Sequence, residues 1–281
     1  MKKYFSLIKF SHTIFAMPFA LIGFFLATKS YDFKWITLLL IILCMVFARS
    51  AAMAFNRYID RDIDKKNKRT ALVREIPNGI IKPKSALIFV IINSLLFIVT
   101  TYLINTLCFI LSPIALIIIL GYSYTKRFTA LCHLILGLGL ALSPIGAYLA
   151  VSGKFDIIPI LFSLCMLFWV SGFDIIYSLQ DKEFDEKQHL HSIPVFFGTK
   201  NALNISILLH ICSIITLIII GNLAVFKLWY WIGLIIFSIL LIYQHTLVKI
   251  DDLSKINLAF FTTNGIASII FGAFVIIELI K

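Results

Sequence analysis

Two clusters of acidic residues have the residue types and the spacing to do chemistry in this sequence. The first is Asn56-Arg57-Tyr58-Ile59-Asp60-Arg61-Asp62-Ile63-Asp64, and the second lies far downstream, between Asp174 and Asp185. On a helix, Asn56, Asp60 and Asp64 follow one another at intervals of four residues and share one face. The same spacing puts Asp181 and Asp185 on one face, with Asp174 two turns earlier.

Carboxylates arranged in this way predict a bound divalent cation. Like charges four residues apart repel each other even in water, and they repel more strongly where the dielectric constant falls. Hard oxygen ligands suit Mg²⁺, which takes one or two carboxylates and completes its shell with water and substrate phosphate. We therefore expect Mg²⁺ and a diphosphate to be held by Asn56, Asp60, Asp64, Asp181 and Asp185.

The composition indicates an integral membrane protein. Hydrophobic residues make up 60% of the chain and charged residues 14%, whereas soluble domains are about 45–50% apolar. The formal net charge of +11 does not indicate nucleic acid binding, because the basic residues lie in short segments between apolar runs and not on one soluble face.

These apolar runs predict an all-α membrane protein with a single domain over residues 1–281. With about twenty residues for each membrane-spanning helix, we expect nine such helices, at residues 12–28, 35–55, 85–104, 106–122, 131–150, 157–176, 201–221, 228–247 and 258–279. An odd number of spans places the two ends of the chain on opposite sides of the membrane.

The connections between these helices differ strongly in basic charge. With a cytoplasmic N-terminus, the cytoplasmic connections carry nineteen of the Lys and Arg residues and the other side carries five. Cytoplasmic loops are enriched in Lys and Arg, so this imbalance predicts that both aspartate clusters face the cytoplasm. Arg49 remains inside a span, where a charge costs at least about 2.5–3.5 kcal/mol, and we expect it to point into a cavity.

A metal-bound diphosphate also needs cationic side chains around it. The best candidates from position alone are Lys126 and Arg127, in the cytoplasmic connection between the fourth and fifth predicted spans. A basic pair that serves only to orient the membrane segments is the alternative interpretation of these two residues.

The two acidic clusters resemble the paired motifs of the UbiA-type intramembrane aromatic prenyltransferases. The first matches Asn-Arg/Asp-x-x-Asp-x-x-x-Asp at Asn56, Asp60 and Asp64. The second matches Asp-x-x-Tyr-(small)-x-x-Asp-x-x-x-Asp at Asp174, Tyr177, Ser178, Asp181 and Asp185. The resemblance covers nearly the whole chain, and it implies nine helices around a central cavity that the aspartate loops cap.

The same resemblance extends to basic residues. Residues 122–129 are similar to the family's Tyr-x-x-x-Lys-Arg-x-Thr element, which implies that Lys126 and Arg127 bind the diphosphate. Arg69 and Arg74 resemble the family's Arg-Thr and Arg-Pro positions, although Glu75 and Ile76 stand between Arg74 and Pro77. Lys9 stands where the family usually has Arg. The resemblance thus implies diphosphate binding by Lys9, Arg69 and Arg74, and binding of the acceptor or the diphosphate by Arg49 and Arg57.

The expected reaction is transfer of a polyprenyl group from its diphosphate to an aromatic acid. Residues 15–23 and 51–62 look like the 4-hydroxybenzoate polyprenyltransferases and their relatives in the futalosine route to menaquinone, which implies 4-hydroxybenzoate or a dihydroxynaphthoate as the acceptor. The catalytic residues implied are Asp60, Asp64, Asp174, Asp181 and Asp185, with Asp174 or Asp181 as the proton acceptor.

Other interpretations of the acidic clusters remain open at the sequence level. A haem or chlorophyll type of prenyltransferase would take a macrocyclic acceptor. A cation- or proton-coupled transporter would carry its carboxylates nearer the bilayer midplane. A CDP-alcohol phosphotransferase would need an Asp-Gly…Ala-Arg pattern, which this sequence lacks. His210 and His245 are expected to form hydrogen bonds between helices and not to bind a metal.

Overall fold

The computed structural model describes Leu7 and residues 15–281, and these residues fold almost entirely into helices. The described part contains no β-strand, only one isolated bridge between Lys249 and Asp252. The longer helices are α2 (Met17–Thr28), α3 (Trp35–Ile59), α6 (Pro83–Ile104), α7 (Thr106–Thr125), α8 (Cys132–Ser152), α9 (Ile157–Ser178), α11 (Ile193–Leu223), α12 (Leu228–Leu247) and α13 (Asn264–Ile280). The all-α fold is confirmed.

Eight segments of the described chain are helical, long and apolar enough to cross a membrane. They coincide with the second to ninth predicted spans, the last being α13 together with the π-helical turn η3 (Leu258–Thr263) that precedes it. The first predicted span, 12–28, begins outside the described residues, and its described part is the shorter helix α2, with twelve residues. The count of nine spans therefore stays a prediction.

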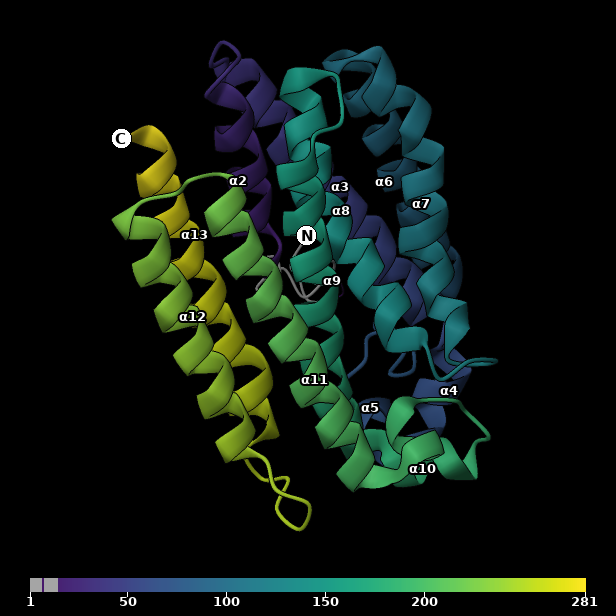
Figure 1. Cartoon of the computed structure of the whole chain (residues 1–281). Coiled ribbons are helices and arrows are strands. Elements are labelled where there is room, and N and C mark those ends of the chain that lie inside the picture. The colour runs from purple at the N-terminus through teal and green to yellow at the C-terminus, as the bar shows by residue number, and fades with distance from the viewer. Residues whose placement is uncertain (1–6, 8–14) are drawn as a thin grey trace.

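Helix α9 lies at the centre of the packing. It contacts α8 on one side and α11 on the other, while α2 packs between α8 and α13, and α3 packs against α6 (Figure 1). The fully buried Trp169 of α9 stacks on Phe19 of α2. Its indole nitrogen donates a hydrogen bond to Asn264 Oδ1 of α13 at 2.9 Å, so α9 is fixed to both of these helices in the core.

Close contact between α8 and α9 depends on Gly137. A Cβ atom at this position would lie 2.4 Å from Ser171 Oγ and 2.7 Å from the Leu167 carbonyl oxygen of α9. Small residues allow membrane helices to approach in this way. The prediction that His210 and His245 form hydrogen bonds between helices is confirmed, and the structure shows that they bond to each other: their ring nitrogens lie 2.8 Å apart and join α11 to α12.

Large apolar side chains cover the outer faces of the bundle. On α6 the exposed apolar residues include Ile88, Ile91, Leu95, Val99 and Tyr102. Exposed apolar surface of this extent is suited to lipid and not to water. Together with the eight spans, it identifies an integral membrane protein.

Short helices gather at one end of the bundle. They are α4 (Arg61–Lys66), α5 (Lys68–Ala71), the 3₁₀ turn η2 (Leu179–Asp181) and α10 (Lys182–Lys187). Figure 1 shows α4, α5 and α10 together at one end and the C-terminus at the opposite end. The two acidic clusters thus lie on the same end of the molecule.

Two details differ from the sequence-based expectations. Neither acidic cluster forms one straight helix, because α3 ends at Ile59 before α4 begins, and η2 interrupts the path from α9 to α10. Helix α11 begins at Ile193, eight residues before the predicted start at 201, and it bends at Gly198, whose φ of 77° is left-handed. Glycine adopts this conformation without a steric penalty.

Candidate active site

A cavity of about 790 Å³ opens between the ends of the helices that carry the acidic clusters. Every candidate site residue in the described part of the chain contributes to its lining: Arg49, Asn56, Arg57, Asp60, Asp64, Arg69, Arg74, Lys126, Arg127, Asp174, Asp181 and Asp185. Lys9 lies outside the described residues. The structure therefore brings together candidates that are up to 136 positions apart in the sequence, from Arg49 to Asp185.

The first cluster is ordered by bonds within its own turn. Asn56 Nδ2 donates to Asp60 Oδ2 at 2.9 Å, and Arg57 Nη1 donates to Asn56 Oδ1 at 3.0 Å. Arg57 is buried, as is Asp64 one turn beyond Asp60. The amide of Asn56 therefore holds one carboxylate while it accepts from a buried guanidinium.

The second cluster turns its carboxylates in different directions. Asp174 of α9 contacts His133 of α8, Asp181 contacts Asn67, which follows the first cluster, and Asp185 contacts Lys126. Asp185 is fully buried although it lies in a short helix at the end of the bundle. Burial of a carboxylate requires a cationic partner.

Each of the four candidate metal-binding aspartates forms an ion pair with one candidate diphosphate-binding residue. Lys126 Nζ lies 2.8 Å from Asp185 Oδ2, and Arg127 Nη2 lies 3.2 Å from Asp60 Oδ1. The other two pairs are Arg69 with Asp181 and Arg74 with Asp64, the latter at 3.5 Å. Acids and bases that were predicted separately thus form one network.

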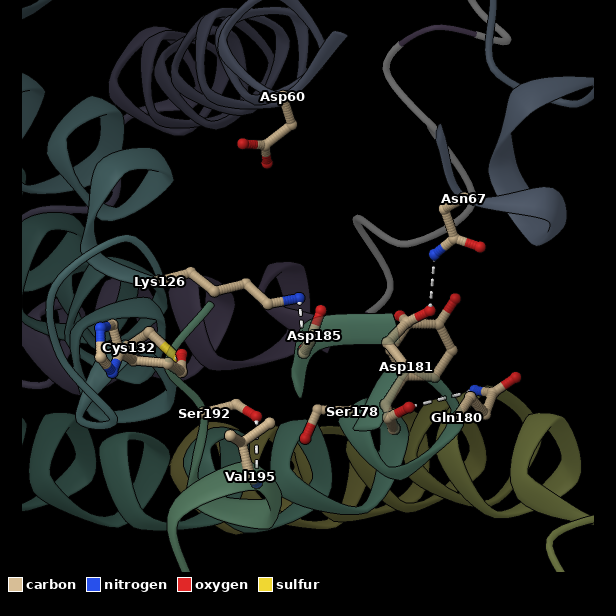
Figure 2. A network of polar contacts seen from close by, with 12 residues as sticks. Asp60, Asn67, Lys126, Cys132, Ser178, Gln180, Asp181, Asp185, Ser192 and Val195 are labelled. Carbon is tan, nitrogen blue, oxygen red and sulfur yellow. Dashed lines mark hydrogen bonds and ion pairs between the residues drawn. The ribbon is translucent and has the colours of Figure 1, made fainter. Parts of the chain in front are cut away.

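Adjacent residues join the two clusters. Lys126 pairs with the second cluster and Arg127 with the first, so both clusters lie within reach of one dipeptide at the end of α7. Figure 2 shows Asp60 across an open space from Lys126 and Asp185. Asn67, three residues after the first cluster, adds a further link, since its side-chain amide donates to Asp181 Oδ1 at 3.0 Å.

Burial and neighbouring charges shift the pKa values of these side chains in opposite directions. Burial raises the pKa of Asp64 to about 6, and it also raises the pKa of Asp60, although the hydrogen bond from Arg127 opposes this effect. For Lys126, burial lowers the pKa, but the nearby Asp185 outweighs burial and the net shift is upward. Lys126 therefore remains charged, while Asp64 takes up a proton more readily than an exposed carboxylate does.

A second, apolar cavity of about 380 Å³ adjoins the first. It lies between α3, α6, α7 and α8, and the two cavities share Arg49, Met53, Tyr122, Leu136 and Leu140 in their lining. Arg49 thus lies at the boundary between a polar chamber and an apolar one. This position agrees with the expectation that a cation inside a span faces a cavity.

Two residues of the site were not predicted from the sequence. Asn67 caps α5 by accepting a hydrogen bond from the Arg69 N–H at 2.9 Å, and it also holds Asp181. His133 Nδ1 lies 2.7 Å from Asp174 Oδ2. The aspartates that these two residues contact, Asp181 and Asp174, lie far from them in the sequence. His133 is 41 positions from Asp174, so only the fold brings the two side chains together.

Comparison with known proteins defines the class of this membrane protein. Residues 16–266 match the model of the UbiA prenyltransferase family. The chain belongs to this family.

Several curated relatives, of which two serve as examples, are named 4-hydroxybenzoate octaprenyltransferase. The one from Photobacterium profundum is 30% identical over 83% of this chain and 81% of its own length. The one from Vesicomyosocius okutanii subsp. Calyptogena okutanii is 32% identical over 88% and 89%, respectively. These relatives support the 4-hydroxybenzoate polyprenyltransferase branch, and the chain is a polyprenyltransferase.

Solved structures share the fold. A UbiA homologue from Aeropyrum pernix K1, in its apo form, superposes with a TM-score of 0.85 at 30% identity, over 95% of this chain and 98% of that one. A UbiA homologue from Archaeoglobus fulgidus, solved with GPP and Mg²⁺, gives a TM-score of 0.77 at 24% identity, over 99% of this chain and 100% of that one.

Proposed function

We propose that this enzyme transfers a polyprenyl group from polyprenyl diphosphate to an aromatic acid, in the biosynthesis of a quinone. The observation that carries the proposal is the network of four aspartate–base pairs around a cavity at the end of a membrane bundle. The names of the curated relatives favour 4-hydroxybenzoate as the acceptor, and a dihydroxynaphthoate is the other acid in the proposal.

Asn56, Asp60, Asp64, Asp181 and Asp185 would hold Mg²⁺. Their oxygen atoms are the hard ligands that this ion prefers. Asp185 supports the assignment, because it is fully buried and its Oδ1 atom has no hydrogen-bond partner in the described part of the chain. No three acidic, His or Cys side chains there are gathered as a ready metal site, so the carboxylates must exchange their basic partners for the ion. Bound Mg²⁺ would neutralise charge on the leaving diphosphate.

The basic residues released by this exchange would bind the diphosphate. Lys126, Arg127, Arg69 and Arg74 already surround the cavity, and charge-assisted hydrogen bonds to phosphate oxygens are among the strongest in proteins. Lys9 belongs to the same proposal from sequence alone. As the allylic C–O bond breaks, these side chains stabilise the charge that develops on the leaving group.

The two cavities would separate the polar and apolar parts of the substrates. The apolar cavity would accept the prenyl chain next to the diphosphate, and its apolar lining would disfavour the water that could hydrolyse a carbocation. Arg49 and Arg57 would bind the acceptor carboxylate or the diphosphate. Arg49 is suited to this role because it lines both cavities.

Asp174 is the better of the two candidate proton acceptors. Both carboxylate oxygens of Asp181 bind Arg69, and Oδ1 also accepts from Asn67. Among the described residues, Asp174 makes a hydrogen bond only through Oδ2, to His133. Its other oxygen would take the proton from the aromatic ring after the new C–C bond has formed.

We also propose that the chain is a single domain in the cytoplasmic (inner) membrane of a bacterium, with the N-terminus and both aspartate loops on the cytoplasmic side. The bacterial origin of the curated relatives and the distribution of Lys and Arg support this location.

The decisive experiment incubates the purified protein with Mg²⁺, a polyprenyl diphosphate and a panel of acceptors, followed by mass analysis of the products. The panel contains 4-hydroxybenzoate, dihydroxynaphthoates and a haem-type macrocycle. We expect a prenylated aromatic acid, and no product when EDTA is present. Prenylation of the macrocycle alone, or turnover that survives EDTA, would contradict the proposal.

A further inference from the structure

His133 and Asp174 form a close pair in the wall of the cavity. His133 is the second residue of α8, and its Nδ1 atom lies 2.7 Å from Asp174 Oδ2 of α9. The His133 side chain is almost completely buried at 3% exposure, whereas Asp174 retains 20%. Both residues line the cavity, so the carboxylate reaches its open space and the imidazole stands behind it.

The hydrogen bond made by His133 Nε2 shows which nitrogen of the imidazole ring carries the proton. The N–H group of Ile193, the first residue of α11, donates to His133 Nε2 at 3.4 Å. An N–H in the first turn of a helix has no partner within that helix, and Nε2 can accept from it only through its lone pair. The ring proton is therefore on Nδ1, from which His133 donates to Asp174.

The segment that holds His133 is fastened to the start of α11 by further contacts. The His191 N–H donates to the Lys126 carbonyl oxygen at 2.7 Å, and Cys132 Sγ lies 3.6 Å from the His191 carbonyl oxygen. Lys126, which pairs with Asp185, and His133, which pairs with Asp174, thus belong to one anchored segment. This arrangement fixes the diphosphate end of the cavity relative to Asp174.

We propose that His133 is a positioning residue, which holds Asp174 so that its second carboxylate oxygen, Oδ1, faces the acceptor ring. The inference rests on the proposed function and adds a residue to it. In the reaction, the allylic C–O bond breaks and its electron pair leaves with the diphosphate, while the ring carbon forms the new C–C bond. The C–H bond of that carbon then breaks, its electron pair restores the aromatic ring, and its proton moves to Asp174. His133 itself neither gives nor takes a proton, because both of its ring nitrogens are engaged in hydrogen bonds, Nδ1 with Asp174 and Nε2 with the Ile193 N–H.

Two substitutions separate this role from simple packing. His133→Leu fills the space but cannot donate to Asp174. His133→Asn places an amide N–H close to the position of Nδ1 and can replace the donor. We expect His133→Leu to lower kcat about tenfold or more, a smaller loss than the roughly 10²- to 10⁴-fold that a positioned acid or base contributes, because Asp174 itself remains, and to leave the KM for polyprenyl diphosphate unchanged. His133→Asn should recover most of the lost kcat.

The kinetic isotope effect of deuterium at the reacting ring position is a measurement that a change in packing alone would not alter. If Asp174 is poorly oriented, proton removal becomes slower relative to the other steps, and the kinetic isotope effect in His133→Leu rises above that of the wild type. If His133→Leu does not fold in membranes, His133→Gln replaces it, because its amide matches the Nε2 position and loses the contact with Asp174.

Each remaining outcome has a defined meaning. Wild-type kcat and an unchanged isotope effect in His133→Leu would overturn the positioning role, and so would equal losses in the Leu and Asn variants. If the wild-type protein prenylates none of the acceptors, the proposed function itself would be wrong.

Discussion

At the scale of single residues, the site is defined by which acid binds which base. The acids and bases themselves were predictable, because charged groups in a chain this apolar need a reason to be there. Their partners were not predictable. Arg69 lies near the first cluster in sequence but pairs with Asp181 of the second, and Arg127, which follows α7, pairs with Asp60 of the first. Such pairing depends on loop geometry that spacing does not encode.

The Asp181→Asn substitution tests whether this carboxylate takes part in the reaction. We expect turnover to fall roughly 10²-fold or more, the scale seen when one charge-stabilising group is lost, while the protein remains folded in membranes. The measurement is prenyl transfer at saturating Mg²⁺.

The matched control is Asp156→Asn. Asp156 caps the far end of α9 by accepting from the Ile158 N–H, and an asparagine oxygen can accept the same bond. Its turnover should equal that of the wild type. Full activity in Asp181→Asn would remove Asp181 from the catalytic set.

At the scale of helices, hydropathy predicted eight spans well because the bilayer fixes the length of an apolar run. The interruptions at Asp60 and at η2 were not predictable, since both segments have helical spacing and no proline or glycine marks the break. The contact of His133 with Asp174 was also hidden, because it depends on how α8 packs against α9.

Gly137→Ala tests that packing. The added Cβ would lie 2.4 Å from Ser171 Oγ and 2.7 Å from the Leu167 carbonyl oxygen, so α8 and α9 must move apart. Overpacking of this kind typically costs about 1–3 kcal/mol. We expect a lower midpoint of thermal unfolding in detergent.

Gly146→Ala in the same helix is the control, because nothing lies within 4 Å of its added Cβ. Its midpoint should stay at or slightly above that of the wild type, since alanine favours helix over glycine. Equal midpoints for the two variants would show that Gly137 does not determine the approach of the helices.

At the scale of the whole molecule, the aspartate loops and the C-terminus lie at opposite ends (Figure 1). The proposed orientation puts the loops in the cytoplasm. It is tested by placing a single cysteine, in a variant without the five native ones, at Asp62 or at Lys154. A membrane-impermeant maleimide should label the Lys154→Cys variant in intact cells and the Asp62→Cys variant only after the cells are opened. The opposite pattern would invert the orientation.

The four aspartate–base pairs also affect the protein when it is empty. Four carboxylates face four basic side chains, so together these groups carry almost no net charge. An enzyme without substrate can therefore keep its reaction chamber at the membrane boundary without drawing counter-ions from the surrounding solution. In the proposed reaction, a diphosphate that arrives with its own magnesium would keep only part of its negative charge, so binding would be an exchange of ionic partners that changes the local electric field little.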